Sequence, residues 1–199
     1  MTLNYYKPLL TLILLIPFAV LVKDVVNNTL GPDPVAVVAD YTGLWAIITL
    51  LITMTMSPVA RVLKKGWVLR ARRQAGLVMF FYACLHVLTF FALEIAWQWS
   101  EVVRALTEQP YIILGMIAFI LLLPLAITST NKWVRRLGRK WKTLHQLVYI
   151  ALPLVFVHGW LQLRADAAEL LPYLMWMLLI LIEQVAYRLN MLPYAMKRR

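Results

Sequence analysis

Residues 142–160, KTLHQLVYIALPLVFVHGW, decide how the chain folds. Between its polar ends the segment is apolar, and its length is close to the ~20 residues that a helix needs to cross a bilayer. It nevertheless contains two histidines, His145 and His158, thirteen positions apart. Because ionisable side chains are costly at membrane depth, we expect a function for them.

The composition extends this interpretation to the whole chain. Of 199 residues, 62% are hydrophobic and 15% are charged, which is too apolar for a water-soluble domain of this size. The net charge of +11 would favour nucleic-acid binding in a soluble protein, but in a membrane protein basic residues also orient the helices. Cys84 is the single cysteine, which excludes an internal disulfide, a paired-cysteine zinc site and a c-type haem attachment.

Six apolar runs divide the sequence. We predict an all-α, polytopic six-helix bundle that forms one transmembrane domain over residues 1–199. The first run resembles the core of a signal peptide, but no A-x-A-like cleavage site follows it, so we keep it as a helix. We detect no internal repeat. The predicted spans are residues 8–26, 41–60, 75–97, 111–130, 144–163 and 171–188.

The basic residues predict the orientation of this bundle. All but three of the 20 Lys and Arg residues fall at the termini or in the connections after the second and fourth runs. Basic loops stay on the cytoplasmic side, so both termini are expected there. Nucleic acid is not an expected partner.

Most of the acidic residues fall on the opposite, outer side. An acidic outer surface suits a partner with basic patches, although loops exposed to water also need charge for solubility alone. The outer acidic residues are Asp24, Asp33, Asp40, Glu101, Glu108, Asp166 and Glu169.

Two of the three histidines are predicted to lie at the same depth. His86 lies about 12 residues past the inner end of the third run, and His158 about 14 past that of the fifth, which at 1.5 Å per residue places both roughly 18–21 Å into the bilayer. Two imidazoles at matched depth can ligate one haem iron, with Phe90, Phe91 and Gly159 leaving an apolar space and Trp160 offering a stacking face. A hydrogen-bonded pair and a proton path are the alternatives.

His145 is predicted to lie at the inner boundary. On an ideal helix its side chain faces a different direction from His158, and the third span has Arg73 at the matching level, beside Arg72. A second haem would therefore lack one ligand. The cluster of His145, Arg72 and Arg73 suits a quinol head group, a flavin phosphate or, without any specific function, lipid phosphates.

Three stretches carry a resemblance to a known family. They are DPVAVVADYTGLWA (33–46), RRQAGLVMFFYACLH (72–86) and ITSTNKWVRRLGRKWKTLHQLVYIALPLVFVHGW (127–160). Together they resemble the MsrQ family, the haem-binding membrane subunits of bacterial methionine sulfoxide reductase systems. The sequence is more distantly similar to ferric reductases and NADPH oxidases, whose third and fifth spans each carry two haem-ligating histidines.

The resemblance implies an electron-transfer subunit. It implies b-type haem, FMN, a quinol donor and a periplasmic molybdopterin partner, MsrP, which performs the terminal chemistry. His86 and His158 match the family's haem-ligand positions, and His145 matches its third histidine. No G-x-G-x-x-G occurs in the sequence, so the donor is expected to be lipid-soluble or a separate protein. A histidine-lined proton channel and a passive membrane anchor are the other functions considered.

Overall fold

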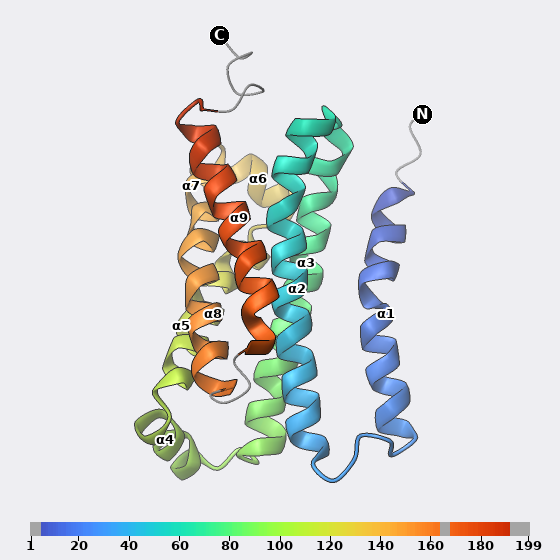
Figure 1. Cartoon of the computed structure of the whole chain (residues 1–199), viewed down its shortest axis with the longest axis vertical. Coiled ribbons are helices and arrows are strands. Elements are labelled where there is room, and N and C mark those ends of the chain that lie inside the picture. The colour runs from blue at the N-terminus through green and yellow to red at the C-terminus, as the bar shows by residue number, and fades with distance from the viewer. Residues whose placement is uncertain (1–4, 164–167, 192–199) are drawn as a thin grey trace.

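Six long helices form the body of the molecule. The computed structural model describes residues 5–163 and 168–191. Within them, the long helices run side by side along the longest axis (Figure 1). They are α1 (Tyr6–Val26), α2 (Pro34–Leu63), α3 (Gly66–Thr89), α5 (Pro110–Ile127), α8 (Val148–Leu163) and α9 (Leu171–Arg188).

Shorter elements extend or connect these helices. A π-helical turn (Phe90–Glu94) continues α3, and α4 (Trp99–Glu108) lies across the end of the bundle beneath α5 and α8 (Figure 1). At the other end are α6 (Asn131–Leu137) and α7 (Arg139–Leu144), and a 3-10 turn (His145–Leu147) joins α7 to α8.

The predicted six-span architecture is confirmed. Within residues 5–163 and 168–191, six helical segments are long and apolar enough to cross a membrane, and each overlaps one predicted span. The third segment ends at Glu94, three residues before the predicted end of that span. Ala96 and Trp97 have φ values of 46° and 59°, a left-handed conformation that no right-handed helix can continue.

Helix α4 was missed in the sequence. Its apolar residues lie on one face of the helix and its polar residues on the other, so its mean hydropathy is too low for a membrane span. Trp99 and Val103 are exposed on its surface, 77% and 64% respectively. An amphipathic helix of this kind lies in the membrane interface rather than across it.

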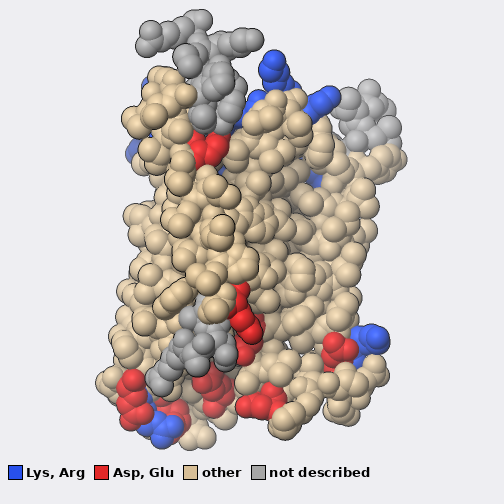
Figure 2. Space-filling view, in the orientation of Figure 1, with Lys and Arg blue, Asp and Glu red and all other residues tan. Residues whose placement is uncertain are grey.

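Charge is segregated between the two ends of the bundle. On the face seen in Figure 2, Lys and Arg gather at the end where α1 begins and α9 ends, whereas Asp and Glu gather at the other end. By the positive-inside rule the first of these ends is cytoplasmic, here called the inner end. Asp166, Lys197, Arg198 and Arg199 lie outside the described residues.

Helix α1 is fixed to the bundle by two tyrosines. The fully buried Tyr82 of α3 donates a hydrogen bond from its hydroxyl to the Leu14 carbonyl (2.9 Å) and accepts one from the Phe18 amide (3.1 Å). Tyr41 of α2 donates to the Pro17 carbonyl at 3.1 Å. Pro17 has no amide hydrogen and weakens the helix locally. The two tyrosine hydroxyls supply hydrogen bonds to backbone carbonyls in this part of α1.

Candidate functional site

A cavity lies inside the outer half of the bundle, between α2, α3, α5 and α8. Its volume is about 330 Å³. Most of its lining is aliphatic or aromatic, and its inner end is closed by Leu50, Met79 and Leu122, which are almost fully buried. The outer end is polar, where Asp40, Gln162 and other groups line it.

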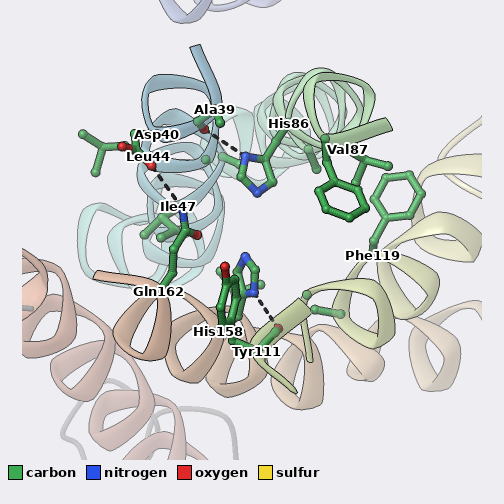
Figure 3. A pocket seen from close by; sticks show the side chains of 18 of the residues that line it. Ala39, Asp40, Leu44, Ile47, His86, Val87, Tyr111, Phe119, His158 and Gln162 are labelled. Carbon is green, nitrogen blue, oxygen red and sulfur yellow. Dashed lines mark hydrogen bonds between the residues drawn. The ribbon is translucent and has the colours of Figure 1, made fainter. Parts of the chain in front are cut away.

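The structure brings His86 and His158 together across this cavity. Their ring centroids are 6.0 Å apart, and the planes of the two rings meet at 79°. The two rings approach from opposite sides of the space, one from α3 and one from α8 (Figure 3).

Each ring is oriented by a backbone carbonyl of a neighbouring helix. Nδ1 of His86 lies 2.9 Å from the carbonyl oxygen of Ala39 on α2, and Nδ1 of His158 lies 2.7 Å from that of Tyr111 on α5. A carbonyl oxygen only accepts hydrogen bonds, so each Nδ1 carries the proton and donates it. In the neutral imidazole the lone pair is then on Nε2, and among the described residues no hydrogen bond occupies either Nε2.

Two glycines make room for the rings. A Cβ atom added to Gly43 would lie 3.1 Å from Nδ1 of His86, and one added to Gly115 would lie 2.8 Å from Cε1 of His158. Both distances are shorter than ordinary van der Waals contact. The rings therefore pack directly on the backbones of α2 and α5.

This arrangement fits a metal held by two opposed imidazoles. Two metal–nitrogen bonds of about 2 Å, plus the distance from each nitrogen to its ring centre, place the centroids about 6 Å apart. In the described part of the chain, no group of three or more His, Cys, Asp or Glu side chains could hold a metal ion. Two opposed imidazoles without a third such side chain are the protein donor set of a haem iron with two axial histidines, in which the porphyrin would fill the other positions.

The outer mouth of the cavity is acidic. Gln162 of α8 donates a hydrogen bond from Nε2 to Oδ1 of Asp40 on α2, at 3.1 Å. Glu94 and Glu169 also line the cavity at this end. Negative charge is thus concentrated where the cavity meets the outer surface.

His145 belongs to a separate cluster at the inner end. Its ring stacks on Trp141 with centroids 3.8 Å apart, and its Nδ1 bonds to the Trp141 carbonyl at 3.0 Å. Its Nε2 is buried and makes no hydrogen bond among the described residues, although the Leu125 carbonyl lies nearby. Arg72 is close enough to interact with this ring electrostatically.

The two arginines of the predicted cluster have different neighbours. Arg72 points into the bundle, where Nη1 donates to Oγ of Ser57 at 2.8 Å and Nη2 contacts Sδ of Met54 at 3.7 Å. Arg73 instead donates to Oδ1 of Asn131, at the start of α6, at 2.6 Å. The inner cluster therefore contains His145 and Arg72, while Arg73 ties α3 to the inner loop.

Only some of the residues expected around the two histidine ligands line the cavity. Phe90 and Gly159 line the cavity, as the sequence predicted. Phe91 stacks on Trp97 instead, with centroids 5.9 Å apart, and Trp160 is 43% exposed and does not line the cavity. The stacking role predicted for Trp160 has no counterpart in this geometry.

Comparison with known proteins identifies relatives over most of the chain. Residues 42–156 match the family model described as "Ferric reductase like transmembrane component". This match includes His86 and His145 and ends two residues before His158.

Curated relatives share 38–41% sequence identity with the chain. A protein of Xanthomonas axonopodis pv. citri is 41% identical over 143 residues, which cover 72% of this chain and 66% of the relative. A protein of Herminiimonas arsenicoxydans is 38% identical over 159 residues, covering 79% of this chain and 73% of the relative. Both are named "Protein-methionine-sulfoxide reductase heme-binding subunit MsrQ". The matched region thus spans slightly less than two thirds of the Xanthomonas protein.

Proposed function

The chain belongs to the ferric reductase-like transmembrane family and, within it, to the MsrQ haem-binding subunits, and from this we propose that it is a b-type cytochrome of the bacterial inner membrane. In this proposal His86 and His158 are the axial ligands of one haem. When bound, the haem supplies a one-electron carrier in the outer half of the membrane. The observation that carries the proposal is the pair of imidazoles, 6.0 Å apart, each with Nδ1 fixed and Nε2 open to an apolar cavity.

The protein around the site supports electron transfer more than proton transfer. A proton relay needs a chain of exchangeable groups, whereas both Nδ1 atoms are held by carbonyls that cannot release a proton. Leu50, Met79 and Leu122 close the inner end of the cavity. Electrons can cross such an apolar layer, but protons cannot.

We place the electron donor at the inner cluster. His145 offers a buried imidazole nitrogen without a hydrogen bond, and the neighbouring Arg72 offers positive charge. A quinol head group needs a proton acceptor and a hydrogen-bond donor, which these two side chains provide. The phosphate of FMN, the second cofactor that the family resemblance implies, would be attracted to the same basic end.

We place the electron acceptor at the acidic outer end. Asp40, Glu94 and Glu169 surround the mouth of the cavity, so a partner with a basic surface would dock where the haem is nearest to water. In this proposal the partner is MsrP, a periplasmic molybdopterin enzyme that reduces methionine sulfoxide in oxidised envelope proteins. The chain itself performs no terminal chemistry.

The purified protein tests the proposal directly. After expression with ample haem, we expect about one haem per chain and the visible spectrum of a reduced b-type cytochrome when dithionite is added. Addition of a quinol should produce the same spectrum. A colourless protein under these conditions would refute the cytochrome function.

A further inference from the structure

The four helices around the cavity form two equivalent pairs. Helices α2 and α5 both run from the outer to the inner end, and α3 and α8 both run back. The carbonyl of Ala39 holds His86, and the carbonyl of Tyr111 holds His158. Within each pair the two bonded residues are 47 positions apart, and the second pair lies 72 positions after the first.

Most of the cavity lining follows the same spacing. All seven positions at which α2 lines the cavity recur 72 residues later on α5, including Gly43 as Gly115 and Leu50 as Leu122. Three lining positions of α3, and Phe90 of its π-helical turn, likewise recur on α8. The expectation of no internal repeat is therefore wrong.

The repeat is difficult to detect in the sequence because only four of these eleven paired positions carry the same residue. Asp40 corresponds to Ile112, for example, and Phe90 to Gln162. The two halves share a glycine, an alanine, a leucine and a histidine at fixed spacing. Both helix pairs run in the same direction and their histidines approach from opposite sides of the cavity, as an approximate two-fold axis along the bundle would arrange them.

We propose that Gly43 and Gly115 are positioning residues, which fix the orientation of His86 and His158 as the two halves of this repeat. On a helix, residues four positions apart lie on one face. The carbonyl of residue 39 or 111 therefore lies next to the glycine at 43 or 115, where the absence of a side chain lets the ring reach that carbonyl. Together the carbonyl and the glycine form a seat for one imidazole.

The seats determine the angle between the rings. In this structure that angle is 79°. When two imidazoles ligate a ferric haem, nearly perpendicular rings give a strongly anisotropic low-spin electron paramagnetic resonance (EPR) signal, and nearly parallel rings give a rhombic one. The angle also affects the reduction potential, so a seat that changes shape should change both measurements.

The two seats differ in how closely they fit. A Cβ at Gly115 would meet three atoms of the His158 ring within 3.2 Å, the nearest at 2.8 Å, whereas a Cβ at Gly43 would meet His86 at 3.1 Å. Gly115→Ala must therefore displace its ring further than Gly43→Ala. Gly76 of α3 provides a matched control, because a Cβ there would lie 3.6 Å from Cγ2 of Thr53, an ordinary contact.

The experiment compares Gly43→Ala, Gly115→Ala and Gly76→Ala as purified, haem-loaded proteins. We expect Gly76→Ala to match the wild type in haem content, EPR signal and reduction potential. Gly43→Ala should keep its haem with an altered EPR signal and potential. Gly115→Ala should also lose affinity for haem, on the order of 10-fold, as when a residue that orients a metal ligand is changed.

Both glycine variants retaining the wild-type EPR signal, potential and haem content would overturn the inference. If Gly115→Ala does not insert into the membrane, the milder Gly43→Ala decides the question alone. The inference rests on the proposed haem site, but the experiment distinguishes an error in the haem site from an error in the role of the glycines. A colourless wild-type protein would overturn both, whereas coloured variants identical to the wild type would overturn only the role of the glycines.

Discussion

Gln162 of α8 and Asp40 of α2 are joined by a hydrogen bond of 3.1 Å across the outer mouth of the histidine cavity. This bond holds the Asp40 carboxylate at the mouth of the cavity, where Asp40 is still exposed to water. A fixed negative charge stabilises the more positive, oxidised state of a nearby redox group.

Asp40→Asn should accordingly raise the reduction potential of the haem. The asparagine can still accept the hydrogen bond from Gln162, so mainly the charge is lost. Asp40 is exposed, and solvent screening limits the expected rise to the order of tens of millivolts. A redox titration of the purified protein measures it. Asp24→Asn, at the outer end of α1, is the control, and an equal shift there would show that the effect is not local.

His86→Ala and His158→Ala should each abolish haem retention. Either change removes one of the two imidazoles that approach each other across the cavity, and with it one proposed axial ligand. The haem-to-protein ratio after purification provides the measurement, with membrane insertion checked by protein yield. A variant that retained a full complement of low-spin haem would show that the ligands have been assigned incorrectly.

His145→Ala should separate the inner cluster from the haem site. Because His145 does not line the cavity, the variant should keep the haem spectrum of the wild type. Its reduction by quinol should slow by on the order of 10- to 100-fold, because the proton acceptor for the quinol is removed. Reduction by dithionite, which needs no such acceptor, is the matched control. Loss of all haem in this variant would contradict the proposed division between the two sites.

The sequence predicted the spans and the depth of the histidines because both depend on local properties. Six apolar runs are visible to hydropathy alone, and helical rise converts a residue count into a depth. That calculation needs no knowledge of neighbouring helices. The calculation predicted that His86 and His158 lie at the same depth, and in the structure both rings line one cavity.

The roles of individual residues around the histidines could not be predicted, because they depend on which faces of the helices pack against each other. Gly43 and Gly115 become important only once each lies against a histidine 43 positions later. Trp160 follows Gly159 directly, but one step along a helix turns its side chain by about 100°, away from the cavity. The spacing shared by the two glycine–histidine pairs is the signal that could have revealed the seats.

The ion pair between Arg61 of α2 and Glu183 of α9 is a further long-range contact, 122 positions apart in the sequence. The two side chains are only 17% and 20% exposed, and the Arg61 guanidinium also lies over the Tyr187 ring at 4.2 Å. In the structure Glu183 ties the last helix to the centre of the bundle.

Glu183→Leu should destabilise the protein, because it leaves the Arg61 charge partly buried without its partner. Loss of one member of a fully buried pair costs about 3–5 kcal/mol, and partial exposure reduces the expected loss to about 1–3 kcal/mol. Thermal unfolding in detergent, followed by circular dichroism, measures the change. The double variant Arg61→Met with Glu183→Leu should recover most of the loss, because two apolar side chains carry no desolvation cost. If the double variant were as unstable as the sum of the two single variants, the ion pair would not be the cause.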